Sequence, residues 1–220
     1  MTIHAYHEIY VNKVQTRLGI AFDYAINVCL IPGEEFTELF CRSQVCRSLE
    51  RGESRYALGK SGIEILVDVI EETTGRAPEI KPECRFFRTK EHWIGWTAAY
   101  CQWYTDRSFR ELFTTIPYSD FEKMYTTLHE ADISKFMDIA EERFRETFRE
   151  TELKRARMCI NITQEELSNR SGVSLRSIQM YEERNRNINK ASFDTLYRLS
   201  KAMYCHPEDL MERWPYDSDS

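Results

Sequence analysis

One tripeptide of the sequence has residue types that could bind a phosphate group. Gly59, Lys60 and Ser61 resemble the end of a phosphate-binding loop, but Ser54 stands where that loop needs its first glycine. Ser61 with Glu64 instead predicts a capping box at the start of a helix. We therefore expect no nucleotide-binding loop at this position.

Histidine, cysteine and carboxylate side chains could bind a metal ion or act as acids and bases, but their spacing argues against both. The five histidines form no His-Glu-x-x-His pattern, and the seven cysteines contain no Cys-x-x-Cys pair. Glu130 and Asp132 lie beside His129, yet Asp132 begins a periodic helix and is explained as its N-cap. We expect reduced thiols, no metal, no cofactor and no catalytic residues, and hence a protein that is not an enzyme.

A run of aromatic side chains between residues 86 and 104 could form a binding surface. Trp93, Trp96, Tyr100 and Trp103 recur at the spacing of one helical face. The simpler interpretation is core packing in a helical domain. The alternative is a groove for a protein partner, because large aromatic side chains are enriched at interfaces. The sequence leaves both interpretations open.

The elements that carry these residues are expected to be helices. Apolar residues recur at three- and four-residue steps, as in Ile133, Phe136, Met137 and Ala140, while Asn-Gly and Asp-Gly hairpin signals are absent. We therefore predict an all-α fold. The predicted helices span 5–29, 34–43, 61–74, 89–104, 109–115, 119–128 and 132–150, with five more in the last part of the chain.

Length and charge indicate two domains, residues 1–150 and 151–220. Near Glu150 the apolar register stops and a basic cluster of Lys154, Arg155 and Arg157 begins, with no flexible linker between them. The net charge is -6, and residues 1–150 hold 25 acidic and 19 basic side chains. Any DNA-binding surface must therefore be local to the tail. The sequence shows neither a signal peptide nor a membrane span, so we expect a cytoplasmic protein.

The tail carries the capping signals of two short helices joined by a tight turn. Thr163 with Glu166 predicts a capping box at the start of the first helix, and Gly172 predicts its left-handed end. Ser174 is the predicted N-cap of the second helix. A turn of about three residues makes the two helices cross steeply. Helical periodicity turns Ile178 inward, so the opposite face of this second helix is available to a DNA groove.

Residues 153–212 resemble the helix-turn-helix family that includes the lambda repressor, Cro and many bacterial antitoxin regulators. The matching positions are Thr163-Gln164, Gly172-Val173-Ser174, Ile178, Tyr181-Glu182 and Leu196 through Leu199. The resemblance implies a five-helix lambda-repressor-like domain that binds a double-stranded DNA operator as a homodimer. Such domains sometimes serve only in protein contact, which is the alternative. This sequence also lacks the glycine that usually follows Tyr-Glu, so we expect an asparagine among residues 183–187 to take any left-handed conformation.

The resemblance also implies roles for individual residues. The positions that read base edges in the major groove are Leu175, Arg176, Gln179 and Met180. The positions that contact phosphates are Gln164, Ser174, Ser177, Arg184 and Arg186.

Residues 1–150 resemble, more weakly, helical domains of uncharacterised bacterial proteins associated with toxin–antitoxin operons. This implies an antitoxin-like autorepressor whose N-terminal domain binds a protein partner, a cognate toxin. The alternative is a ligand-responsive repressor whose N-terminal domain binds a small molecule. A third interpretation, an enzyme with a regulatory DNA-binding tail, requires titratable residues clustered in a pocket.

Overall fold

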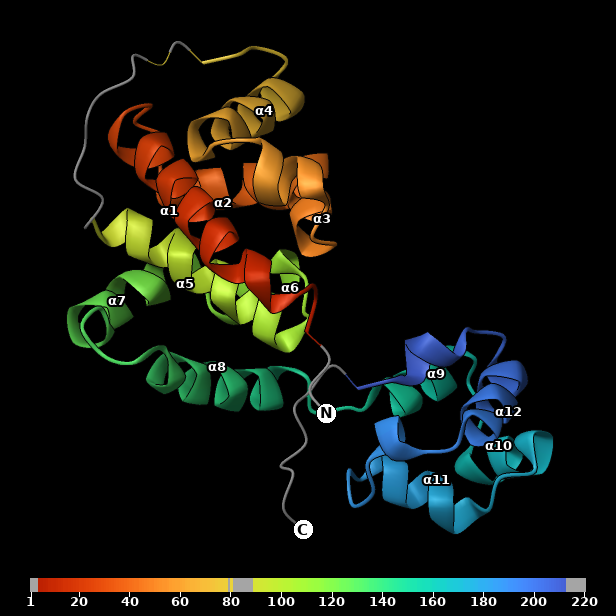
Figure 1. Cartoon of the computed structure of the whole chain (residues 1–220). Helices are drawn as coiled ribbons and strands as arrows, with labels where there is room; N and C mark the ends of the chain where they lie inside the picture. Colours follow the sequence, from red (N-terminus) through yellow and green to blue (C-terminus); the bar gives the residue numbers. More distant parts are fainter. Residues whose placement is uncertain (1–3, 79, 81–88, 213–220) are drawn as a thin grey trace. The chain divides into compact units, whose positions relative to one another are not determined.

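The computed structural model describes residues 4–78, 80 and 89–212, which form two compact units (Figure 1). The N-terminal unit is Met1–Phe144 and the C-terminal unit is Arg145–Ser220. Every regular element in the described residues is helical, which confirms the all-α prediction. None of the described helices is both long enough and apolar enough to cross a membrane.

The N-terminal unit is built from eight α-helices and two short helical turns, counted over its described residues. The elements are η1 (Glu8–Tyr10), α1 (Val11–Asn27), α2 (Gly33–Arg42), α3 (Gln44–Glu50), η2 (Arg55–Gly59), α4 (Gly62–Thr74), α5 (Lys90–Thr105), α6 (Phe109–Thr115), α7 (Tyr118–Leu128) and α8 (Ile133–Thr147). The first three residues of the predicted aromatic run, 86–88, lie outside the described residues.

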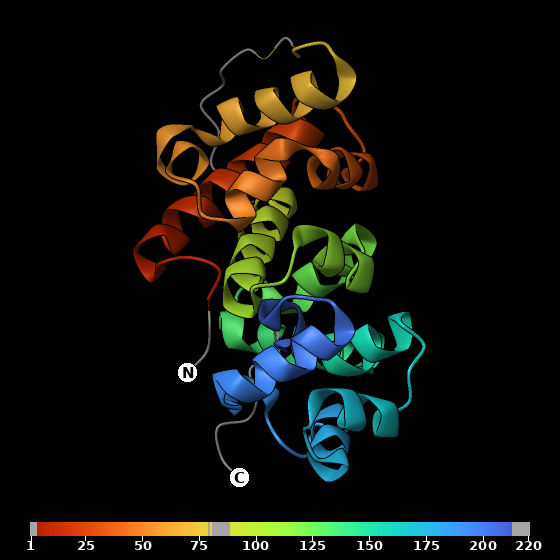
Figure 2. The same ribbon diagram turned by 90° about the vertical axis from the view of Figure 1, so that its right-hand side faces the viewer.

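Helix α1 lies at the centre of this unit, with α4 on one side and α5 on the other (Figures 1 and 2). Two glycines allow this close packing. A Cβ atom on Gly62 would lie 2.4 Å from the carbonyl oxygen of Arg17, and one on Gly95 would lie 2.5 Å from that of Leu18. Both distances are too short for any side chain, so glycine is required where α4 and α5 meet the backbone of α1.

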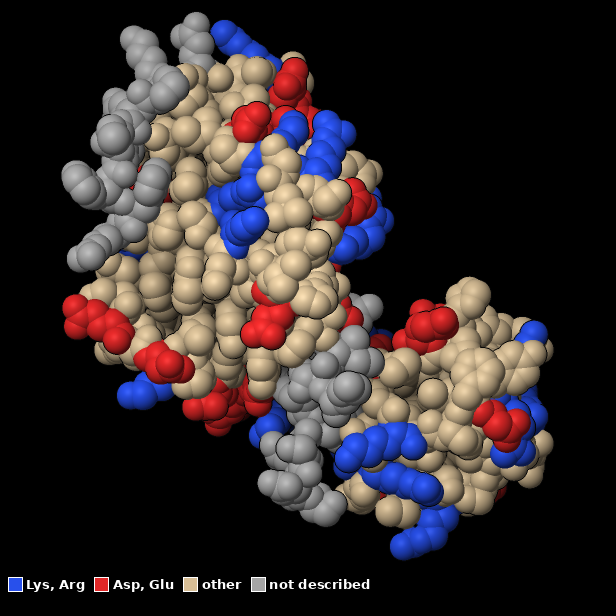
Figure 3. All heavy atoms as spheres, in the orientation of Figure 1, with Lys and Arg blue, Asp and Glu red and all other residues tan. Residues whose placement is uncertain are grey.

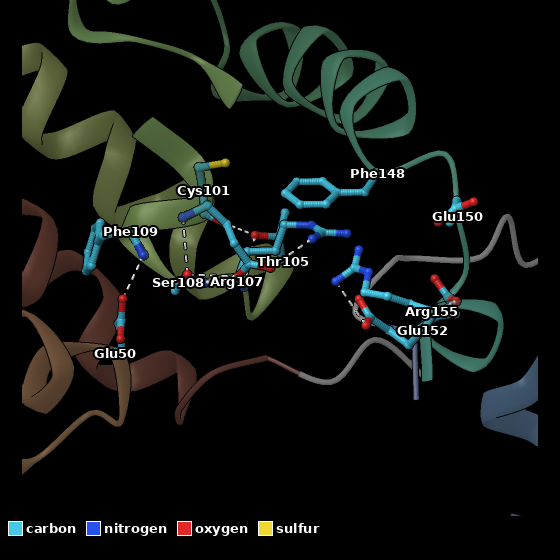
Figure 4. A network of polar contacts seen from close by, with 12 residues as sticks. Glu50, Cys101, Thr105, Arg107, Ser108, Phe109, Phe148, Glu150, Glu152 and Arg155 are labelled. Atoms are coloured by element: carbon cyan, nitrogen blue, oxygen red, sulfur yellow. Dashed lines mark hydrogen bonds and ion pairs between the residues drawn. The ribbon is translucent and has the colours of Figure 1, made fainter. Parts of the chain in front are cut away.

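Aromatic side chains fill the core between α1, α2 and α6. Phe22 contacts Phe36 edge to face with ring centroids 5.0 Å apart, and Phe40 contacts Phe109 in the same way at 4.9 Å. The backbone N–H of Phe109 donates to the carboxylate of Glu50 at 2.7 Å, which ties the start of α6 to the end of α3 (Figure 4). This geometry fixes the short helices around the longer ones.

Two of the helix predictions need correction. The helix predicted from residue 5 begins at Val11, because His7 caps a separate short turn by accepting from the N–H of Ile9 at 3.3 Å. The prediction also has no helix at 44–50, where Ser43 caps α3 by accepting from the N–H of Cys46 at 3.1 Å. Seven residues are too few to show clear apolar periodicity.

The C-terminal unit packs its helices around one small apolar core. Its elements are α9 (Glu152–Cys159), α10 (Gln164–Ser171), α11 (Leu175–Glu182), η3 (Ile188–Lys190), α12 (Phe193–Met203) and η4 (Pro207–Leu210). The centre of the core is formed by Leu153, Leu167, Ile178, Leu199 and Leu210, all of them fully buried. The fifth helix expected in this domain is the short turn η4.

Candidate nucleic-acid interface

The turn between α10 and α11 has the geometry that the sequence signals predict. Thr163 and Glu166 form the capping box at the start of α10, and the N–H of Thr163 holds the pKa of Glu166 below its ordinary value. Gly172 ends α10 in the left-handed conformation with φ at 66°. Ser174 then caps α11 by accepting from the N–H of Ser177 at 3.2 Å. These local signals position α11 directly after a tight turn.

The two helices are joined by side chains at their crossing. Leu167 from α10 and Ile178 from α11 are fully buried in the same apolar core. Val173 of the turn belongs to this core and is 6% exposed. The hydroxyl of Ser168 donates to the carbonyl of Val173 at 2.7 Å, which satisfies a backbone acceptor inside the turn. The inner face of α11 is therefore fully used in packing.

A buried ion pair fixes the far end of α11. Arg157 on α9 donates from Nε and Nη2 to the two carboxylate oxygens of Glu182, at 2.7 and 2.8 Å. The amide Nε2 of Gln164 donates to Glu182 as well, at 2.8 Å, and the hydrogen bond that Arg157 donates to Glu182 raises the pKa of Arg157. A single carboxylate thus links α9, α10 and α11.

The outer face of α11 carries the side chains expected to read bases. Arg176 is exposed and makes no hydrogen bond or ion pair within the described part of the chain. Leu175, Gln179 and Met180 flank it and are half-buried. An unpaired guanidinium on an eight-residue helix is a suitable donor for a guanine edge in a major groove.

The residues expected to contact phosphates are in three different situations. Ser174 and Ser177 lie at the N-terminus of α11, where their hydroxyls are hydrogen bonded to each other at 2.8 Å. Gln164 lies at the N-terminus of α10 with its amide oriented by Glu182. Arg186 is exposed, with its guanidinium 5.6 Å from the centre of the Tyr181 ring.

Arg184 is held inside the C-terminal unit. Its guanidinium donates to the carbonyls of Phe148 and Arg149 at 3.0 and 2.9 Å, and pairs with Glu212 at 3.3 Å. This geometry favours a structural role over the expected phosphate contact. Residues 148–150 are thereby bound to the C-terminal unit.

The prediction that an asparagine takes the left-handed conformation in this loop is wrong. Arg184 does so, with φ at 56°, and neither Asn185 nor Asn187 has a positive φ. A left-handed conformation costs a residue with a side chain about 1 kcal/mol. The hydrogen bonds of the guanidinium, three of them to the carbonyls of residues 148–150, offset that cost.

Positive charge gathers on the side of the C-terminal unit that carries α11. On the face drawn in Figure 3, lysine and arginine side chains lie along α11 and the loop that follows it. The exposed ones in this stretch are Arg176, Arg186 and Lys190. A local basic surface of this kind attracts the DNA backbone even though the whole chain is acidic.

The four aromatic residues expected on one face of α5 do not form one exposed surface. Trp103 is 6% exposed, because its indole stacks on His4 at 4.0 Å and donates to the carbonyl of Tyr6 at 2.7 Å. Tyr100 is half-buried and packs against Trp103. Trp93 and Trp96 are half-buried at the other end of the helix.

Sequence reasoning missed the residues that hold the interface in place. The sequence places Arg157 only in a basic cluster and Glu182 only among the positions that match the family, and it indicates no role for Glu212, which is 5% exposed. Glu212 accepts from the N–H of Glu152 at 2.8 Å as well as from Arg184. Only the pairing of the elements reveals these contacts, since the partners lie far apart in the chain.

The comparisons with known proteins agree with this geometry in the C-terminal unit. A helix-turn-helix family model matches residues 153–210, and the N-terminal unit lies outside the match. No curated protein and no solved structure matches the chain. Residues 153–210 are therefore a helix-turn-helix domain of the lambda-repressor and Cro type, and the chain is a DNA-binding regulator of transcription.

Proposed function

We propose that this protein binds a specific operator as a homodimer and represses the transcription of its own gene. The observation that carries the proposal is the outer face of α11, where exposed Arg176 stands between half-buried Leu175 and Met180. The inner face of the same helix is fixed by the core and by Glu182. A helix held this rigidly can present the same donors to a groove each time it binds.

Dimerisation follows from the size of the reading surface. An eight-residue helix covers only a few base pairs, so a specific site needs two half-sites about one helical turn apart. The C-terminal unit exposes apolar area that fits this requirement. Phe193 and Tyr197 stack on each other on α12 and are 72% and 46% exposed. Exposed aromatic side chains of this size are typical of protein interfaces.

Selection of DNA from a random library by the full chain tests the proposal. We expect an enriched sequence with two-fold symmetry, a footprint over both half-sites, and a dimer in sedimentation at micromolar concentration. A monomer that protects one isolated half-site would contradict the dimeric arrangement. Repression is tested by placing the chain's own promoter before a reporter gene, where added protein lowers its expression.

A second candidate function concerns the input to this regulator. The N-terminal unit holds a cavity of about 450 Å³ between α5, α7 and α8, lined mostly by apolar and aromatic side chains. This observation favours the ligand-responsive repressor, because cavities of this size suit small molecules. That the N-terminal unit binds a cognate toxin stays a prediction. Purification from the native host distinguishes the two, by a retained small molecule or by a protein that copurifies.

A further inference from the structure

Aromatic rings form much of the wall of this cavity in the N-terminal unit. Trp93 and Trp96 from α5 line one wall, Tyr125 from α7 a second and Phe136 from α8 a third. The indole of Trp93 meets the ring of Tyr125 edge to face at 5.6 Å and that of Phe136 at 6.2 Å. Such contacts hold the rings in fixed orientations around the space they enclose.

The described residues that line this cavity carry a negative formal charge. Among the described residues that line it there is one formal charge, the carboxylate of Glu130, and no lysine or arginine. The Glu130 side chain is 88% exposed, so it stands at the mouth rather than in the depth. His92 lines the inner part, where burial lowers the pKa of its imidazole and favours the neutral ring.

The helices around the cavity strengthen this negative field. Figure 3 shows acidic side chains spread over α7 and α8, the two helices that form the outer walls. Residues 118–147, which form these helices and the turn between them, hold eight acidic side chains and four basic ones. Their net charge is therefore negative, which attracts a cation and repels an anion.

We propose that this cavity binds a small organic cation, an ammonium group carried on an apolar or aromatic body. The rings of Trp93 and Trp96 attract the positive charge, and the apolar body fills the space beside Phe136. Tyr125 lines the cavity with its ring stacked on that of His129 at 4.6 Å. Glu130 adds a negative charge at the mouth of the cavity. This inference names the class of ligand for the ligand-responsive repressor proposed above. Only the effect of that ligand on operator binding rests on the proposed function.

Calorimetric titration of the full chain at pH 8, where an imidazole of ordinary pKa is neutral, tests the inference. The probes are phenyltrimethylammonium, benzyltriethylammonium and tetraphenylphosphonium, with tert-butylbenzene as the neutral isostere of the first and benzoate as an anion. We expect saturable binding of at least one cation, phenyltrimethylammonium binding about threefold to thirtyfold more tightly than tert-butylbenzene, and no binding of benzoate. Equal affinity for the cation and its isostere, or no binding of any cation, overturns the inference.

Paired variants locate the binding. Trp96→Ala should weaken cation binding at least tenfold, while Tyr100→Ala, which removes a half-buried ring one turn further along α5 and outside the cavity, should not. Glu130→Gln should weaken cation binding about fivefold, as expected for one solvent-exposed charge at close range. Asp138→Asn, an exposed carboxylate on α8 that does not line the cavity, is its matched control. Equal losses within either pair place the cation elsewhere and refute the site.

Failure of this inference is separable from failure of the proposed function. Cation affinity is measured without DNA, and operator affinity is measured without cation. A chain that binds its operator but no cation refutes the cavity ligand alone, and a chain that binds cations but no operator refutes the regulator.

Discussion

Arg157 and Glu182 form a two-pronged ion pair, 25 residues apart in the chain, that joins α9 to the end of α11. The side chains are 13% and 3% exposed, so little water screens the charges. Glu182 also accepts a hydrogen bond from Gln164, so its carboxylate links α11 to α10 as well as to α9. The orientation of the candidate DNA surface therefore depends on this buried contact.

Removal of this carboxylate should destabilise the C-terminal unit. Glu182→Ala leaves the guanidinium of Arg157 buried without its partner, and the loss of one member of such a pair costs about 3–5 kcal/mol. Hydrogen exchange of the full chain, read at the amides of α11, measures the change in opening free energy. Arg155→Ala is the control, because its pair with Glu152 is partly exposed and worth about 1 kcal/mol or less. Similar effects of the two variants would show that the buried pair is not special.

Signals confined to a few residues could be predicted from the sequence. The capping boxes at Ser61 and Thr163 and the left-handed end at Gly172 are confirmed, because each depends on residues within one turn of a helix. The inward position of Ile178 follows from helical periodicity in the same way and is confirmed by its burial.

Contacts between distant residues could not be predicted. Arg184 and Glu212 are 28 residues apart, and nothing in the sequence near Arg184 distinguishes it from an arginine that contacts phosphate. The aromatic face of α5 is a similar case. Its periodicity is visible, but only the stacking of His4 on Trp103, and the contact of Tyr125 with Trp93, separate a core ring from a cavity wall. Pairing of elements decides these roles, and one sequence does not specify it.

The left-handed backbone of Arg184 gives a prediction with an internal comparison. Both Arg184→Ala and Arg184→Gly remove the guanidinium that holds the carbonyls of residues 148–150. Glycine adopts the left-handed conformation without strain, so the alanine variant should be less stable than the glycine variant by about 1 kcal/mol. Trypsin cleavage after Arg149 should be faster in both. Arg186→Gly, at an exposed residue with ordinary backbone, is the control and should leave the cleavage rate unchanged.

Burial of His92 predicts a stability that falls in mild acid. Burial lowers the pKa of His92 in the folded chain, and the nearby charge of Asp23 opposes this only in part. The unfolded chain therefore binds the proton more tightly, and the folded state loses stability as the pH falls below the ordinary histidine value of about 6.5. Urea denaturation at pH 7.5 and 5.5, followed by the fluorescence of the tryptophans on α5, measures the loss. His92→Gln should lose less stability over this interval than the natural chain does, and an equal loss would assign the effect to other groups.

The last prediction separates base reading from phosphate contact on the C-terminal unit. Arg176→Ala should cost about 1–3 kcal/mol on the selected operator and little on unrelated DNA, because it removes a directional contact to one base. Gln164→Ala should weaken binding to every sequence alike, because we expect its amide, which donates to Glu182 in the free chain, to contact a phosphate when DNA binds.

Arg186→Ala is the charge-matched control for Arg176→Ala, because both remove an exposed arginine. It should lower the slope of log affinity against log salt by about one per half-site while leaving the preference for the operator intact. Affinities are measured for the operator, for the operator with the contacted guanine replaced, and for unrelated DNA, each at several salt concentrations. They give the loss of operator affinity, the preference for the operator and the salt slope of each variant. If Arg176→Ala and Arg186→Ala reduce operator and unrelated DNA binding by the same factor, then α11 does not read bases through Arg176, and the exposed face of this helix contributes only charge.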